Sequence, residues 1–203
     1  MKIRIFYIIL LLVGLVAADT NGSPVKRRKP EYVLAHLNKL WLPSSDGKAV
    51  QLSSVAKHRA TVFIFLSSEC PISNRFMPTL TRLSTEFTPS DIQFYGIISD
   101  PDCDTACAAK FLKDYNFPSQ MLLDPQHQLV KLLDASITPE AFVLTNDGMC
   151  VYQGRIDDRY IELGKDRPAP TTNDLRNVIT EIFSGKKMEF REVRAIGCAI
   201  PPL

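Results

Sequence analysis

A cysteine stands where an apolar run gives way to a proline and a helical pattern. Residues 65–78 read FLSSECPISNRFMP, and Cys70 closely follows the run ATVFIFL at residues 60–66. Such a β-branched and aromatic run is typical of a strand buried on both faces. We expect a helix to begin near Ser73, with its electropositive N-terminus beside an uncovered Cys70 sulfur. That position lowers the pKa of a thiol and favours a nucleophile; the alternative is a packed structural cysteine.

A nucleophilic cysteine without a neighbouring partner needs a second thiol, because otherwise the reaction stops at a mixed disulfide. Three candidate resolving cysteines are Cys103, Cys107 and Cys198. Cys103 and Cys107 could also pair with each other, but only across a non-helical first turn, since helical positions four apart hold their Cβ atoms too far apart. Cys198 could equally anchor the tail or link to another chain. Cys150, amid apolar neighbours, is predicted to lie in the core.

Strand and helix patterns alternate along the chain. Strands are predicted at residues 60–66, 92–99, 140–144 and 149–156, with an extended piece at 120–124. Helices are predicted from Ser73 onward and at residues 105–117, 127–135 and 171–185. This order predicts an α/β domain with a mixed sheet, parallel core strands, a C-terminal β-hairpin and helices on both faces. Right-handed crossovers place Cys70 and the loop at residues 100–107 on one rim of the sheet.

These residues resemble the thioredoxin superfamily, in particular its exported bacterial redoxin branch of proteins similar to alkyl hydroperoxide reductase and thiol-specific antioxidant. Pro78 stands eight residues after Cys70, where thioredoxins have a helix-kinking proline. Thr138 and Pro139, just before EAFVL, match the family's cis-proline beside the reactive thiol. The resemblance covers about residues 35–185. It implies a thioredoxin-like fold, Cys70 as the nucleophile, and a backbone edge at Pro139 where a substrate strand could pair.

The chain also departs from the family patterns. Ser73 replaces the second cysteine of thioredoxin, and it could either hydrogen-bond the thiolate or cap the helix. Phe63 and Ser67 replace the proline and threonine of the peroxiredoxin motif. The leading hypothesis is therefore a thiol-disulfide oxidoreductase that acts on a protein or small-molecule disulfide and uses an external thiol reductant. A peroxiredoxin-like thiol peroxidase, acting on peroxide in an antioxidant role, is the alternative.

A second alternative is a copper-binding or assembly protein that uses Cys103 and Cys107, with or without Cys70. A soft metal tolerates their Cys-x-x-x-Cys spacing. Copper-delivery proteins of the superfamily, however, carry that spacing at the corner that Cys70 occupies here. The leading hypothesis therefore requires no metal and no cofactor.

The first residues predict export. Lys2 and Arg4 precede an apolar stretch that ends at Ala18 and is too short to span a bilayer comfortably. This pattern is typical of a cleaved signal peptide at residues 1–18, and an uncleaved anchor is the alternative. We therefore expect a periplasmic or extracellular protein with no stable membrane span after cleavage.

Charge gives no argument for nucleic-acid binding. The 203-residue chain has a formal net charge of +2, and removal of the signal peptide takes that to about zero. The basic cluster at residues 26–29 is most simply part of a linker at residues 19–34. A single redoxin domain at residues 35–185 follows, and then a tail at residues 186–203 that carries Cys198. The charged segment at residues 154–168 predicts a salt-bridged turn or, less simply, a partner contact.

Overall fold

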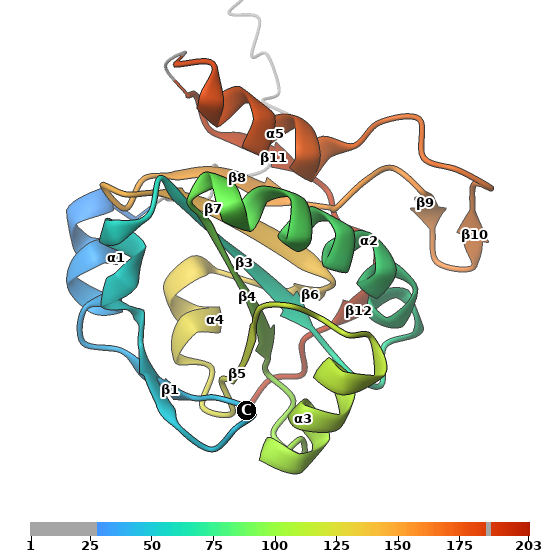
Figure 1. Ribbon diagram of the computed structural model, residues 1–203. Coiled ribbons are helices and arrows are strands. Elements are labelled where there is room, and N and C mark those ends of the chain that lie inside the picture. Colours follow the sequence, from blue (N-terminus) through green and yellow to red (C-terminus); the bar gives the residue numbers. More distant parts are fainter. Residues whose placement is uncertain (1–27, 186–187) are drawn as a thin grey trace, which may run out of the picture.

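A six-stranded mixed sheet forms the centre of the protein. The computed structural model describes residues 28–185 and 188–203, so the predicted signal peptide and most of the predicted linker lie outside the described residues. The strands follow the spatial order β11–β8–β7–β3–β4–β5 (Figure 1). Their bounds are β3 (Ala60–Leu66), β4 (Ile92–Ile98), β5 (Gln120–Leu123), β7 (Glu140–Thr145), β8 (Cys150–Gly154) and β11 (Arg191–Val193).

The central strands are parallel and the later ones turn back. Strand β4 runs parallel to both β3 and β5, whereas β7 pairs antiparallel with β3, and β8 pairs antiparallel with β7. Strand β11 adds to the outer edge of β8 in the parallel direction. The sheet thus contains the parallel core and the antiparallel hairpin that the sequence predicts, and the predicted fold class is confirmed.

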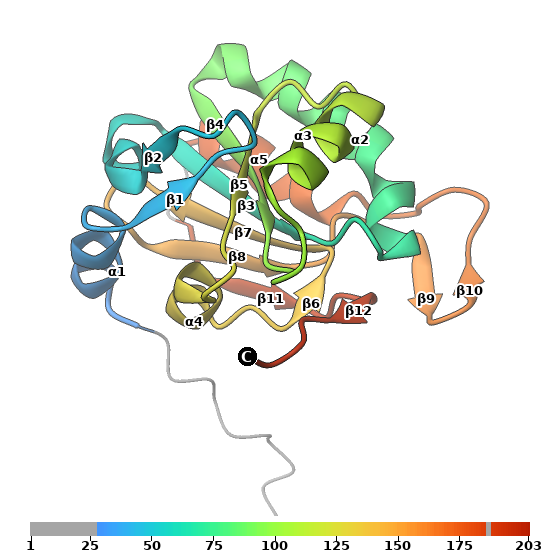
Figure 2. The same ribbon diagram turned by 90° about the horizontal axis from the view of Figure 1, so that it is seen from below.

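Two apolar clusters cover the two faces of the sheet. In β3, Val62, Ile64 and Leu66 point to one cluster, while Phe63 and Phe65 point to the other. This alternation explains why the strand has no polar face. The first cluster packs against α2 (Pro71–Phe87), α3 (Thr105–Asp114) and α5 (Asp174–Phe183). The second packs against α1 (Pro30–Leu37), the 3-10 helix η1 (Leu52–Lys57) and α4 (Gln128–Leu133) (Figure 2).

Three small sheets and a short helix complete the fold. The pairs are β1 (Trp41–Pro43) with β2 (Ala49–Gln51), β9 (Tyr160–Glu162) with β10 (Lys165–Asp166), and β6 (Ile137–Thr138) with β12 (Cys198–Ala199); η2 spans Thr88–Ser90. The β9–β10 pair projects beside the N-terminal end of α2 (Figure 1). Strands β6 and β12 lie side by side at the end of the sheet where β3 stops (Figure 2).

Some boundaries differ from the sequence predictions. Helix α1 begins at Pro30, within the segment predicted as linker, because a proline at the first helical position needs no backbone donor. Helix α3 ends at Asp114 rather than at residue 117. The segment predicted as a tail instead adds β11 to the main sheet and β12 to β6. No helix among the described residues is long and apolar enough to cross a membrane.

Candidate active site

Cys70 occupies the corner between β3 and α2. It is the N-cap residue of α2, and Pro71 follows at the first helical position. Its backbone N–H donates to the carbonyl oxygen of Ser67 at 3.2 Å, and its own carbonyl oxygen accepts from the N–H of Asn74 at 3.0 Å. The sulfur therefore lies at the electropositive end of a long helix, as the sequence predicts.

Thr138 and Pro139 lie against Cys70. The peptide bond between these two residues is cis. The protonated Cys70 thiol donates a hydrogen bond to the carbonyl oxygen of Thr138, with a sulfur-to-oxygen distance of 3.2 Å. The structure thus brings Cys70 and Thr138, which stand 68 positions apart in the sequence, into direct contact, and Pro139 follows Thr138.

Ser73 lies one helical turn after Cys70 and is fully buried. Its hydroxyl accepts a hydrogen bond from the backbone N–H of Ser67 at 3.4 Å. Burial raises the pKa of the Cys70 thiol, but hydrogen bonds from the Cys198 thiol and from the N–H and hydroxyl groups of Ser73 outweigh it, so the pKa lies below its ordinary value. The alternative role of Ser73 as the cap of the helix is wrong, because Cys70 is the N-cap residue and Ser73 lies inside α2. Ser73 instead supports the thiolate.

Cys198 is the second sulfur of the site. It lies in β12, opposite Thr138 of β6, and its carbonyl oxygen accepts a hydrogen bond from the Thr138 hydroxyl at 3.3 Å. Burial, its hydrogen bond to Cys70 and the negative charge on Cys70 raise the pKa of the Cys198 thiol to about 12. Cys70 and Cys198 are not joined by a disulfide. Cys70 is thus the sulfur that ionises, and Cys198 is the donor that stabilises it.

The expectation of an uncovered sulfur is wrong. Cys70 is only 1% exposed and belongs to the apolar cluster beneath α2. Strand β12 pairs with β6 beside the site and brings Cys198 near Cys70. No pattern in the sequence predicts this pairing of the tail with β6.

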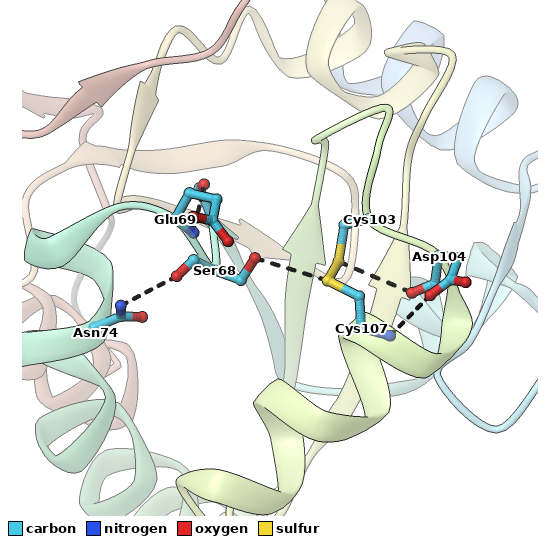
Figure 3. The surroundings of a disulfide bond; sticks show 7 residues. Ser68, Glu69, Asn74, Cys103, Asp104 and Cys107 are labelled. Atoms are coloured by element: carbon cyan, nitrogen blue, oxygen red, sulfur yellow. Dashed lines mark hydrogen bonds between the residues drawn. A yellow bond between two sulfur atoms is a disulfide. The ribbon is translucent and has the colours of Figure 1, made fainter.

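Cys103 and Cys107 form a disulfide, with their Cα atoms 5.4 Å apart (Figure 3). Helix α3 begins at Thr105, after the N-cap residue Asp104, whose carboxylate accepts from the N–H of Cys107 at 2.9 Å. Cys103 therefore precedes the helix, which removes the spacing problem of a pair four residues apart. The non-helical first turn required for this pairing is present.

This disulfide lies near the loop that carries Cys70 but does not join it. The sulfur of Cys107 is 3.7 Å from the hydroxyl oxygen of Ser68 (Figure 3). Among the described residues no group of three histidine, cysteine or acidic side chains could hold a metal ion. Since the two thiols already bond to each other, the structure offers no ligand set in support of the copper hypothesis.

Sequence reasoning missed Tyr160 at the first position of β9. It is buried, its ring lies 5.6 Å from that of Phe76 in α2, and its hydroxyl has no hydrogen-bond partner among the described residues. Burial raises the pKa of Tyr160, and the charge of the Cys70 thiolate adds to that effect. Its only signal in the sequence was its place within the charged segment after β8.

That charged segment is a network anchored by later residues. Arg155 donates to the carboxylate of Asp174 in α5 at 2.7 Å. Asp158 accepts from the backbone N–H groups of Thr171 and Thr172, at 2.6 and 2.9 Å, and pairs with Arg167. The predicted salt-bridged turn is present in this form. Its hydrogen bonds hold the connection between β8 and β9 and so position Tyr160 near α2.

Cys150 lies outside the site. It is partly buried in β8, and its thiol donates to the carbonyl oxygen of Tyr152 at 3.2 Å. It packs against the apolar cluster on the face of the sheet opposite α2. The prediction of a fully core position is therefore only partly met.

A family model described as the AhpC/TSA family matches residues 34–153, which is more than half of the chain. The chain belongs to the AhpC/TSA family. This AhpC/TSA protein matches no curated protein. It is a thioredoxin-like redoxin, and members of this family are generally thiol oxidoreductases or thiol peroxidases.

Solved structures agree with this placement. An uncharacterized conserved protein from Geobacillus kaustophilus is 26% identical, with a TM-score of 0.71 over 79% of this chain and 87% of that chain. A secreted disulfide oxidoreductase of Mycobacterium tuberculosis is 16% identical, with a TM-score of 0.53 over 75% and 98%. Peroxiredoxin Q of Xanthomonas campestris is 16% identical, with a TM-score of 0.56 over 75% and 95%. The latter two share the fold alone.

Proposed function

We propose that this AhpC/TSA protein is an exported thiol-disulfide oxidoreductase with Cys70 as its nucleophile. One observation carries the proposal: the Cys70 sulfur lies at the N-terminus of α2, against the carbonyl oxygen of Thr138, with donors from Ser73 and Cys198 around it. These donors stabilise the thiolate, which is the species that attacks a disulfide. Export rests on the residue pattern before Asp19 and remains a proposal.

The reaction has two steps. The Cys70 thiolate attacks one sulfur of a substrate disulfide, forms a mixed disulfide with it and releases the other sulfur as a thiolate. A second thiolate of this chain then attacks the Cys70 sulfur, forms an internal disulfide and releases the remaining substrate sulfur. Two electrons have passed from the protein dithiol to the substrate. The two protons from the protein thiols end on the substrate thiols.

Cys198 is the resolving thiol that the geometry favours. Cys198 pairs with Thr138, whose carbonyl oxygen accepts from the Cys70 thiol, and it contributes to the lowered pKa of Cys70, so the two cysteines are neighbours. Cys103 and Cys107 bond to each other and must be reduced before either could take part. When Cys70 forms the mixed disulfide, its negative charge leaves with the released substrate thiolate. Because that charge helps to raise the pKa of Cys198, the Cys198 pKa then falls, and the thiolate needed for the second step forms more easily.

An external thiol reductant must then restore the dithiol. A small or protein dithiol reduces the Cys70–Cys198 disulfide by the same exchange chemistry. In an exported protein such a pair would serve redox balance outside the cytoplasm, where unpaired thiols otherwise oxidise.

The direct test is reduction of a protein disulfide. The purified chain should accelerate the reduction of insulin by dithiothreitol, and Cys70→Ser should reduce the rate to the uncatalysed level. Cys150→Ser, on the far face of the sheet, is the matched control and should retain the wild-type rate. Equal rates for the wild type and Cys70→Ser would refute the role of Cys70.

Thiol peroxidase activity is the second candidate. Membership of the AhpC/TSA family supports it. Phe63 and Ser67, which stand where the peroxiredoxin motif has proline and threonine, and the Thr138–Pro139 pair, which replaces an arginine, count against it. Consumption of hydrogen peroxide or an alkyl hydroperoxide by the reduced chain, lost in Cys70→Ser, would establish this activity in place of disulfide reduction or beside it.

A further inference from the structure

The last residues of the chain form a strand on the edge that faces Cys70. Strand β12 pairs antiparallel with β6, with Cys198 opposite Thr138 and Ala199 opposite Ile137. The backbone N–H of Ile200 extends the pairing and donates to the carbonyl oxygen of Ser136 at 2.9 Å. This short strand therefore takes up the free edge of β6 next to the sulfur.

Gly197 allows the strand to come this close. A Cβ atom at this position would lie 2.1 Å from the carbonyl oxygen of Thr138, a separation that side chains essentially never show. The obstacle is backbone on the neighbouring strand and cannot rotate away. A glycine directly before the cysteine is thus a steric requirement for this register.

The pairing also closes the site. The Thr138 carbonyl oxygen contacts the Cys70 sulfur, and the strand opposite Thr138 brings Cys198 over it. Cys70 is 1% exposed with β12 in this place, so an external disulfide has no path to the sulfur in this arrangement. A thiolate can attack only a sulfur that it can reach along the disulfide axis.

A groove of about 1150 Å³ runs beside this pairing. Gly197 and Ile137 form one side of it, and the β9–β10 pair forms the other, with the exposed side chains of Ile161 and Leu163. An extended polypeptide segment on β6 would continue into this groove, and its apolar side chains would contact Ile161 and Leu163.

We propose that β12 is an internal occupant of the edge at which an extended polypeptide substrate pairs with β6, so that Cys70 meets an external disulfide only after β12 has moved away. This inference rests on the proposed function and adds to it a substrate class and a gate. The substrate is a polypeptide with a disulfide cysteine in an extended segment. A glycine before that cysteine fits best, because in the register of β12 a side chain there would collide with the carbonyl oxygen of Thr138, as at Gly197. The gate is β12 itself.

The gate fits the order of the two reaction steps. With β12 displaced, Cys70 attacks the substrate disulfide and releases one substrate thiolate. With β12 returned, Cys198 attacks the Cys70 sulfur, releases the second substrate thiolate and forms the Cys70–Cys198 disulfide. That bond fixes β12 on β6, so the oxidised protein stays closed until an external dithiol reduces it.

Alkylation of Cys70 tests the gate in the full chain. On a Cys198→Ser background, iodoacetamide labelling of the reduced protein is followed by mass mapping of the peptide that contains Cys70. Gly197→Val should speed the labelling at least about tenfold, because the collision with Thr138 shifts the equilibrium toward the open state. Ala199→Val, an exposed neighbour in the same strand, is the matched control and should leave the rate unchanged.

Two outcomes would overturn the gate. One is equal labelling in Gly197→Val and the background protein; the other is equal acceleration by Ala199→Val. Should Gly197→Val fail to fold, hydrogen exchange in the wild-type chain decides. The N–H of Ile200 should exchange at least about tenfold more slowly in the protein with the Cys70–Cys198 disulfide than in the reduced protein. Equal exchange in both states refutes the gate.

A peptide probe tests the substrate class. A synthetic peptide with the sequence of residues 194–201, its cysteine replaced by serine, should slow the alkylation of Cys70 in Gly197→Val, and the same peptide with valine for its glycine should not. Equal effects of both peptides would refute the glycine preference. Alkylation of Cys70 does not depend on catalysis, so the two proposals can fail separately. A protein whose Cys70 is protected by β12 but which reduces no disulfide would contradict the proposed function only. A protein that reduces disulfides while Cys70 is already accessible would contradict the gate only.

Discussion

Thr138 connects the two sulfur-bearing segments: its hydroxyl donates to the carbonyl oxygen of Cys198, and its own carbonyl oxygen accepts from the Cys70 thiol. The residue before the cis-proline thus bonds to both cysteines. Each contact joins a side chain to a backbone carbonyl oxygen, and the pairing of β6 with β12 sets Thr138 opposite Cys198.

Ser73→Ala should raise the pKa of the Cys70 thiol, because the hydroxyl that donates to the thiolate is removed. The thiolate absorbance at 240 nm should then appear at a higher pH than in the wild type, and at neutral pH the rate of disulfide exchange should fall. Ser84→Ala is the control, since this buried serine of the same helix bonds to Ser119 instead. An unchanged titration midpoint would show that the Ser73 hydroxyl only accepts from the backbone N–H of Ser67 and does not act on the thiolate.

Removal of the Cys103–Cys107 disulfide should affect stability and leave the reactivity of Cys70 unchanged. The bond closes a very short loop, so the double variant Cys103→Ala and Cys107→Ala should lose about 2 kcal/mol of unfolding free energy. Urea unfolding without reductant measures this loss, and reduced wild-type protein should approach the variant. A large loss of insulin reduction in the double variant would instead make this pair part of the electron path.

Asp158→Ala should destabilise the protein in a pH-dependent way. Hydrogen bonds from Thr171 and Thr172 lower the pKa of Asp158 to about 2. A carboxylate with a depressed pKa stabilises the fold above its unfolded pKa of about 4, and the contribution is lost as the pH falls toward 2. At pH 7 the variant should lose about 2 kcal/mol in urea unfolding, since charged hydrogen bonds disappear.

The difference between wild type and Asp158→Ala should shrink steadily as the pH is lowered from 4 toward 2. Glu162→Ala, an exposed acidic position in the neighbouring strand β9, serves as the comparison and should change the unfolding free energy by less than about 1 kcal/mol. A loss that is the same at every pH would mean that Asp158 acts through packing and not through its charge.

Tyr160→Phe should leave stability unchanged or raise it by up to about 1 kcal/mol, because a buried hydroxyl without a partner costs free energy and the ring contact with Phe76 remains. Urea unfolding measures the effect. Tyr152→Phe is the contrasting variant, since its hydroxyl donates to the carbonyl oxygen of Arg155 at 2.6 Å and its loss should be destabilising. A clear loss in Tyr160→Phe would reveal a partner for the hydroxyl.

Much of the fold follows from local pattern. The continuous apolar run at residues 60–66 predicts a strand buried on both faces, and β3 has those bounds. The thiol at the start of α2 and its contact with Thr138 follow from parallel strand order together with the family resemblance. Helix α5 is also recovered, because its apolar spacing and the terminal glycine at position 185 are local signals.

The contacts made by the tail could not be predicted in this way. Strands β11 and β12 are too short to show any period, and their pairing depends on edges formed by residues far earlier in the chain. The position of Cys198 opposite Thr138, on which its proposed resolving role rests, depends on that pairing. Gly197 carried no visible signal, since the need for a missing side chain appears only once Thr138 lies opposite.

Strand β11 pins Arg191–Val193 to β8, so only residues 194–197 separate this fixed point from Cys198. The five residue steps from Val193 to Cys198 span at most about 18 Å, so a released Cys198 stays tethered close to the site. Short tethers give effective concentrations in the millimolar range or above. Dissolved thiols below that level would lose the competition for a mixed disulfide on Cys70, and the rate of resolution would not depend on how much thiol the surroundings contain.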